Sequence, residues 1–143
     1  KLLETFWKKI GSKVDIMDAK QHDYILSITS HIPHLIAYNI VHTSINIQDE
    51  KESSIVKYSA GGLRDFTRIA ASNPIMWRDV FIQNKKNTSE MIDKFIENLE
   101  GLKKAIENED GKKLEEIFTK TQKIRKEIIE AGQDVSKPDF GRK

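Results

Sequence analysis

The sequence predicts an all-α fold, and three observations support that class. Apolar residues recur at three- and four-residue intervals along most of the 143 residues, which is the period of a helix that buries one face. Charged residues of both signs are dense and interleaved after residue 84, as on long solvated helices. A single short segment, residues 13–17, alternates polar and apolar side chains as a strand does.

The composition excludes several classes of function. The chain has 24 Lys and Arg against 22 Asp and Glu, and its formal net charge of +2 offers little attraction for nucleic acid. No window approaches the roughly 18 apolar residues of a membrane span. Because there is no cysteine, disulfides and thiolate metal sites are excluded. We therefore expect a cytoplasmic protein with no nucleic-acid or membrane partner.

The first 17 residues are interpreted as the remnant of a different domain. Apolar residues between positions 2 and 10 have helical spacing, and Gly11 is placed to end that helix with a positive φ. The predicted strand at 13–17 follows, and a lone strand needs a partner to be stable. The chain also starts at Lys1 rather than at an initiating Met. These features predict that an α/β domain precedes this segment in a longer polypeptide.

A long helix is predicted from Asp18 to about Ile47. Asp18 can cap its first turn. Its apolar residues lie around the whole cylinder, which predicts burial on nearly all sides. Pro33 lacks a backbone N–H and its ring clashes with the carbonyl of Thr29, so a kink is expected there.

Short helices are predicted after this long one. Gly61 and Gly62 permit positive φ angles and predict a tight turn or a ligand-facing loop. Residues 63–71 are expected to form one short helix. Ser72-Asn73-Pro74 then stops it and starts the next, which runs over residues 75–84.

Two long amphipathic helices are predicted on either side of Gly111. Each carries an apolar stripe on an otherwise charged surface, so the stripes should pack against each other or against a second subunit. Residues 133–143 show no periodicity and are predicted to be disordered. The helical domain is therefore expected to span residues 18–132.

Polar residues gather on one face of the long apolar helix. At about 100° per residue, Asp23, Ser30 and His34 lie within about 40° of one another, and His31 lies about 60° from His34. The two histidines and a nearby carboxylate could hold a metal, but the Glu-x-x-His pairs of helical-bundle metal sites are missing, so we expect no metal. A pocket for a polar ligand is the more economical interpretation. The alternative is that each histidine is a hydrogen-bonded core or interface residue.

A second cluster follows the two glycines. Arg64 and Arg68 lie four residues apart, and Asp65 can orient Arg68 from one turn away. An arginine held by a carboxylate offers a rigid fork for a substrate carboxylate or phosphate. A surface ion pair without a function is the alternative. Trp77 either walls such a pocket or belongs to the core.

These segments, in this order, resemble the C-terminal domain of the prephenate dehydrogenase family, which includes prephenate, arogenate and cyclohexadienyl dehydrogenases. The resemblance covers roughly residues 1–110, and its motifs are His22-Asp23, Ser30-His31-Ile32-Pro33-His34, the run from Gly61 to Ala70, and Pro74-Ile75-Met76-Trp77-Arg78-Asp79. It implies an all-helical domain of the type at the C-terminus of 6-phosphogluconate dehydrogenase. In the family this domain forms a homodimer and completes the active site of an N-terminal Rossmann domain that binds NAD or NADP.

The resemblance implies a role in tyrosine biosynthesis, the oxidative decarboxylation of prephenate or arogenate. Arg68 matches the arginine that binds a substrate carboxylate, and His34 matches a histidine that contacts the substrate. Ser30 and His31 occupy the first positions of the same motif as His34. The positions expected to support the pocket are Asp65, Asp23, Gly61, Gly62 and Trp77.

The family's catalytic histidine belongs to the nucleotide-binding domain and has no counterpart in this chain, so the chain alone is expected to be inactive. The alternative is a free-standing helical interaction or regulatory module without a substrate, because the chain has no nucleotide-binding glycine motif. A strand, a Gly-x-Gly-x-x-Gly turn and a helix encoded upstream of Lys1 would distinguish the two.

Overall fold

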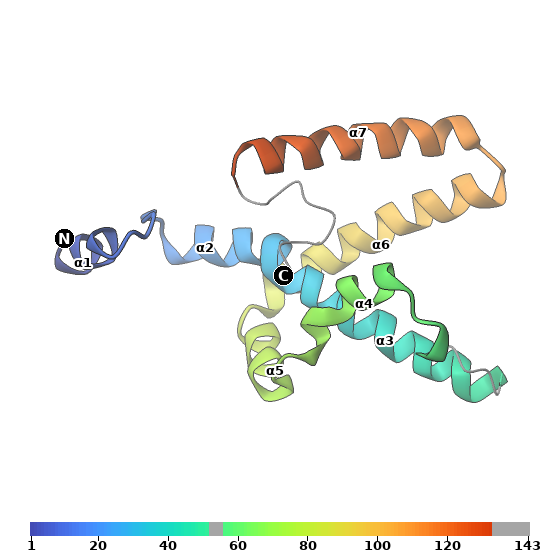
Figure 1. The fold of residues 1–143 in the computed structure, drawn as a ribbon, viewed down its shortest axis with the longest axis horizontal. Coiled ribbons are helices and arrows are strands. Elements are labelled where there is room, and N and C mark those ends of the chain that lie inside the picture. Colours follow the sequence, from blue (N-terminus) through green and yellow to red (C-terminus); the bar gives the residue numbers. More distant parts are fainter. Residues whose placement is uncertain (52–55, 133–143) are drawn as a thin grey trace. The chain divides into compact units, whose positions relative to one another are not determined.

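The computed structural model describes residues 1–51 and 56–132, with only the backbone considered for residues 48–51 and 56. Within these ranges every regular element is a helix, which confirms the predicted all-α class (Figure 1). The chain divides into two compact units, residues 1–93 and a second unit that starts at Lys94. No helix of the described ranges is long and apolar enough to cross a membrane.

The N-terminal segment contains one helix, α1 (Leu2–Lys9). Gly11 follows it at φ +89°, the positive angle predicted from its position. Residues 12–18 form no regular element, so the predicted strand at 13–17 is wrong. An alternating segment becomes a strand by hydrogen bonding to a neighbouring strand, and the described part of the chain supplies none.

The predicted long helix consists of three contiguous pieces: α2 (Ala19–Leu26), the π-helical turn η1 (Ser27–His31) and α3 (Ile32–Lys51). Asp18 caps α2 as expected, because its side chain accepts a hydrogen bond from the Gln21 backbone N–H at 2.9 Å.

The turn η1 lies where the sequence predicted a kink. The backbone N–H of Ile32 bonds to the carbonyl of Ser27, five residues earlier, instead of to the carbonyl four residues earlier. Pro33, which has no N–H to donate, follows directly after this departure from the α-helical ladder. π-helical turns of this kind are frequent at functional sites.

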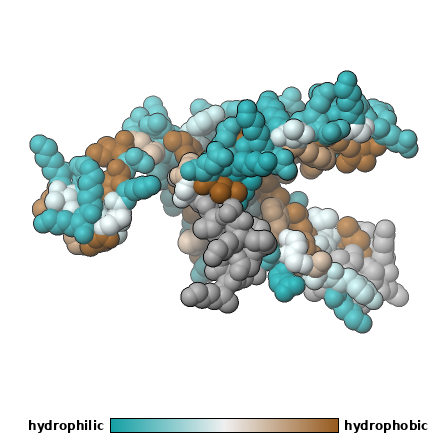
Figure 2. Space-filling model, turned by 45° about the horizontal axis from the view of Figure 1, so that its top comes forward, coloured by the Kyte–Doolittle hydropathy of each residue, from teal (hydrophilic) through white to brown (hydrophobic). Residues whose placement is uncertain are grey.

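The long helix is buried along part of its surface only. Ile32 and Ala37 are buried at 4% and 0% exposure, whereas Ile28 and Ile45 remain 50% and 45% exposed. Burial on nearly all sides is therefore not achieved within one chain, because the elements that pack on α3 leave other apolar side chains uncovered. Figure 2 shows hydrophobic surface lying next to hydrophilic surface on the described helices.

Four short elements follow: η2 (Val56–Tyr58), α4 (Gly61–Thr67), η3 (Arg68–Ala71) and α5 (Pro74–Gln83). Both α4 and η3 pack against α3. The hydroxyl of Tyr38 in α3 donates to the carbonyl of Ser72 at 2.8 Å, which ties the end of η3 to the long helix.

Helix α5 starts at Pro74, one residue before the predicted start at residue 75. The side chain of Asn73 accepts hydrogen bonds from the backbone N–H groups of Ile75 and Met76, and Pro74 is the first helical residue. This cap fixes the start of the helix that carries Trp77.

Gly61 and Gly62 do not form the predicted turn with positive φ. They are the first two residues of α4, and the positive φ angles of the described residues occur at Gly11, Gly132 and Glu109. The chain enters α4 directly from an extended residue, so both glycines adopt helical angles. An added Cβ at either glycine would meet nothing within 4 Å, so neither glycine is required for a close approach to other described atoms.

The two predicted long helices are α6 (Lys85–Glu107) and α7 (Gly111–Glu130), which a short turn joins in Figure 1. Asp110 caps α7, its side chain accepting a hydrogen bond from the Lys113 backbone N–H at 2.9 Å.

Within the second unit an open groove of about 620 Å³ lies between α6 and α7. Its apolar lining comes from Leu102, Ile117, Ile124 and Ile128. Residues 133–143, which were predicted to be disordered, lie outside the described residues.

Candidate functional site

Two histidines of the long helix meet the aromatic side chains of α5. The ring of His34 stacks on Trp77, with centroids 3.7 Å apart and planes 25° apart. His31 lies edge-on to Trp77 and to Phe81 at 6.2 and 6.3 Å. We call these four residues, His31, His34, Trp77 and Phe81, the histidine–aromatic cluster. The structure thus brings together three predicted site residues that lie up to 46 positions apart in the sequence.

Trp77 carries an unused hydrogen-bond donor. The side chain is 7% exposed, and its indole Nε1 atom is buried without a hydrogen-bond partner among the described residues. A buried donor left unpaired costs about 1–3 kcal/mol. An oxygen acceptor from a bound ligand is one way to recover that free energy.

His34 is held in one orientation by the main chain. Its Nδ1 lies 2.9 Å from the carbonyl oxygen of Ser30. A carbonyl only accepts, so Nδ1 donates and carries a proton. In the neutral ring Nε2 is then an acceptor. Ser30 contributes its backbone carbonyl to His34, and the ligand-binding role of this face stays a prediction.

His31 is buried, at 7% exposure. Burial lowers the pKa of its imidazole below the ordinary value of 6.5, because the charged ring is poorly solvated there. The carboxylate of Asp23 opposes this shift, whereas the charged forms of His22 and His34 add to it. His31 is therefore a neutral ring near pH 7.

Asn84, at the end of α5, contacts His31 and was missed by the sequence analysis. Its Nδ2 lies 3.3 Å from His31 Nδ1, and the hydroxyl of the buried Thr88 lies 3.5 Å from the same nitrogen. The only sequence signal for Asn84 is a polar residue between an apolar helix and a charged one. Its partner is 53 positions away, so spacing could not reveal the contact.

Asp23 supports the site through its backbone. Its carbonyl accepts a hydrogen bond from Asn84 Nδ2 at 2.7 Å. Its exposed carboxylate instead lies 3.1 Å from His22 Nδ1. The carboxylate is thus engaged with a neighbouring exposed side chain.

The predicted ion pair between Asp65 and Arg68 is not formed. Arg68 is exposed and makes no hydrogen bond or ion pair with any residue that the structure describes. Helix α4 ends at Thr67 and η3 begins at Arg68, so the two residues belong to different kinds of helical turn and lose the spacing of one α-helix. Asp65 has interactions of its own.

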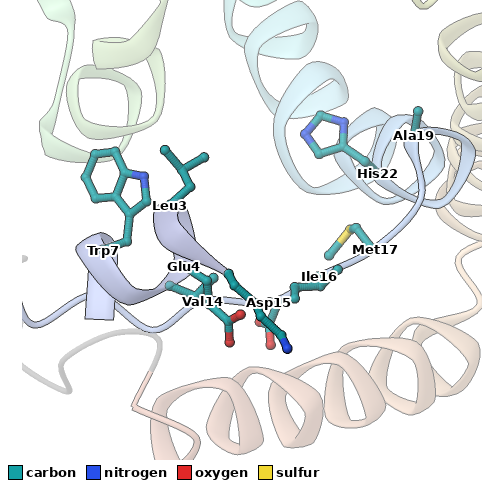
Figure 3. Close-up of a pocket in the computed structure, with 10 residues that line it drawn as sticks. Leu3, Glu4, Trp7, Val14, Asp15, Ile16, Met17, Ala19 and His22 are labelled. Carbon is teal, nitrogen blue, oxygen red and sulfur yellow. The ribbon is translucent and has the colours of Figure 1, made fainter. Parts of the chain in front are cut away.

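A separate hollow of about 590 Å³ lies beside α1 in the first unit. Leu3, Trp7, Met17 and His22 line part of it, from α1, the irregular segment and α2 (Figure 3). None of the predicted site residues lines this open hollow, and the sequence analysis did not anticipate it.

Comparison with known proteins places this geometry in a family. The family model described as the dimerization domain of prephenate dehydrogenase matches residues 18–120. The chain is 39% identical over 120 residues to a cyclohexadienyl dehydrogenase of Zymomonas mobilis, covering 84% of this chain and 41% of that protein. It is 33% identical over 124 residues to a prephenate dehydrogenase of Bacillus subtilis, covering 87% and 33%. The chain spans less than half the length of these relatives.

Solved structures agree with these matches. Prephenate dehydrogenase from A. aeolicus, in complex with hydroxyphenyl propionate and NAD+, has a TM-score of 0.83 and 39% identity, over 89% of this chain and 44% of that one. Synechocystis arogenate dehydrogenase, at 20% identity and a TM-score of 0.76 over 88% of this chain and 46% of that one, shares the fold. The resemblance inferred from the motifs is confirmed: this chain belongs to the family of the prephenate dehydrogenase dimerization domain.

Proposed function

We propose that this chain is the substrate-binding and dimerisation part of an enzyme that oxidatively decarboxylates prephenate or arogenate. The observation that carries the proposal is the histidine–aromatic cluster, in which a stacked histidine and an unpaired indole N–H meet beside the long helix. Family membership supports the choice of reaction, since the relatives are prephenate and cyclohexadienyl dehydrogenases.

The groups of the site suit an oxygen-rich anion. Arg68 has an exposed guanidinium without a partner among the described residues and sits on η3, which packs on α3. We assign it to a substrate carboxylate, which accepts two parallel hydrogen bonds from such a fork. Trp77 offers a donor and His34 an acceptor, which can align the substrate. Ser30, Asp65, Gly61 and Gly62 keep their proposed supporting roles on the strength of the motif alone.

The proposed reaction needs a hydride acceptor, which a nicotinamide cofactor held outside this chain would supply. A hydride would leave the carbinol carbon of prephenate, and the bond to the ring carboxylate would break with release of carbon dioxide. The electron pair of that bond completes the aromatic ring, and the hydroxyl remains as the phenol of 4-hydroxyphenylpyruvate. The seven glycines of this chain form no Gly-x-Gly-x-x-Gly pattern, so we assign NAD or NADP to residues outside it.

The uncovered apolar side chains support assembly as a homodimer. Several lie along the long helix and others line the groove between α6 and α7. The matching family model describes a dimerization domain. A free-standing helical module that binds no substrate is the competing function, and the unpaired donor of Trp77 favours the ligand-binding one.

The test is steady-state kinetics of the complete enzyme that contains this chain. Arg68→Ala should raise KM for prephenate roughly tenfold to a hundredfold, because a hydrogen-bonded charge pair worth about 1.5–3 kcal/mol is lost. Arg78→Ala is the matched control, since Arg78 is exposed and already paired with Asp79 at 2.8 Å. Equal KM values for Arg68→Ala and the unaltered enzyme would refute the assignment.

A further inference from the structure

The side-chain amide of Asn84 is fixed in one orientation. Its Nδ2 faces the backbone carbonyl of Asp23 at 2.7 Å, and a carbonyl can only accept a hydrogen bond. Its Oδ1 accepts a hydrogen bond from Asn87 Nδ2 at 2.8 Å. Exchanging the two ends of the Asn84 amide would place two acceptors together at Asp23, whichever way the Asn87 amide is turned. The group that faces His31 is therefore the NH2 group.

This orientation decides the protonation of His31. The Asn84 Nδ2 lies 3.3 Å from His31 Nδ1 and has only hydrogens to offer. A proton on Nδ1 would set two donors against each other, so Nδ1 is the acceptor. The Thr88 hydroxyl, 3.5 Å from the same nitrogen, can donate as well. His31 and Thr88 are 7% and 4% exposed, so water has little access to replace these partners.

We propose that Asn84 is a positioning residue that holds His31 in the neutral form with its proton on Nε2. Nε2 then carries the donor of the ring, and it has no hydrogen-bond partner among the residues that the structure describes. The Nε2–H group is therefore available to an oxygen of the substrate, an inference that rests on the proposed function. His34 Nδ1 donates to the Ser30 carbonyl, so the two histidines of the cluster use their Nδ1 atoms in opposite ways, one as an acceptor and one as a donor.

Nitrogen NMR of the 15N-histidine-labelled chain near pH 7 tests the proposal, because long-range proton–nitrogen spectra distinguish the two tautomers. We expect the Nε2–H form of His31 to exceed the Nδ1–H form by at least about tenfold, as for one buried hydrogen bond. Since free histidine also favours Nε2–H, the decisive variant is Asn84→Asp. Its carboxylate can only accept, so it should draw the proton to Nδ1 and reverse the ratio.

Asn46→Asp is the matched control. Asn46 Nδ2 also lies 3.3 Å from a histidine nitrogen, Nε2 of His42, but that pair is exposed to solvent. Water competes for both partners there, so the tautomer ratio of His42 should change little.

Two results would overturn the proposal. One is a predominant Nδ1–H form of His31 in the unaltered chain, which requires no variant to fold. The other is an unchanged ratio in Asn84→Asp with a native circular dichroism spectrum. Neither readout needs substrate, so unchanged kinetics in Arg68→Ala would refute the proposed role of Arg68 and leave the role of Asn84 standing.

Discussion

The helices of the first unit are interrupted by irregular turns, whereas those in the described part of the second unit are regular. In the first unit a π-helical turn and two 3-10 turns lie between or beside α-helices, and His31, Thr88 and Trp77 are buried. The second unit contributes the end of α6 and all of α7, where Ala105 is the buried residue among those described. Irregular turns bring unlike side chains together, and regular charged helices present continuous stripes. This difference supports a ligand site in the first unit and subunit contact in the second.

The largest expected effect comes from removing the aromatic centre of the first unit. Trp77→Ala should lower the free energy of unfolding by about 3–5 kcal/mol, because a buried tryptophan is replaced by a cavity. The stack on His34 and the contact with Phe81 are lost at the same time. Urea unfolding followed by circular dichroism measures the change.

The chain contains its own control for this substitution. Trp7 on α1 is 46% exposed and packs edge-on against Phe6 alone among the described aromatic rings. Trp7→Ala should therefore cost less than about 1 kcal/mol. Equal losses for the two variants would show that the histidine–aromatic cluster is no more tightly packed than the N-terminal segment.

Local signals were sufficient for much of the first unit's outline. The cap at Asp18 and the positive φ at Gly11 follow from single residues and were predicted correctly. The strand predicted at 13–17 is wrong because a segment of alternating polar and apolar residues forms a strand only beside a partner strand. The turn predicted at Gly61 is wrong because a glycine permits a positive φ without requiring it.

The candidate site was less predictable because its contacts are long-range. Helical spacing placed His31 and His34 near one face, and the motif added Trp77. The contact of Asn84 with His31 joins residues 53 positions apart, and no local pattern encodes it. The predicted Asp65–Arg68 ion pair is wrong because the change from α4 to η3 falls between the two residues, and helical spacing alone does not reveal that change.

An intermediate effect is expected at the apolar groove of the second unit. Ile124 is 49% exposed and lines this groove. If a second copy of the chain covers the stripe, Ile124→Glu buries an unpaired carboxylate at the contact and should convert the dimer to monomer. The mass measured by light scattering should then fall from about twice the 16.5 kDa of the chain to the mass of a single copy.

Lys123→Glu provides the comparison on the charged face of the same helix. Lys123 is exposed beside Glu116 and Lys120, so a change of its charge should leave the dimer intact. A monomeric unaltered chain, or equal masses for Ile124→Glu and the unaltered chain, would remove the assembly role from the second unit.

The smallest expected effect is a pH dependence confined to the first unit. Because burial lowers the pKa of His31 in the folded chain below the ordinary 6.5, the unfolded chain binds more protons between the two values. Its contribution to stability is therefore present above about pH 6.5 and is lost as the pH falls toward the folded pKa. Urea midpoints should be measured between pH 5 and 8, roughly one and a half pH units on either side of the ordinary histidine pKa. The midpoints should decline on the acid side of this range. His31→Gln should flatten that decline, whereas His42→Gln, at an exposed histidine of α3, should retain it. If the decline is the same in both variants, the acid sensitivity arises outside the buried cluster. The buried histidine of the first unit would then no longer distinguish it electrostatically from the solvated helices of the second.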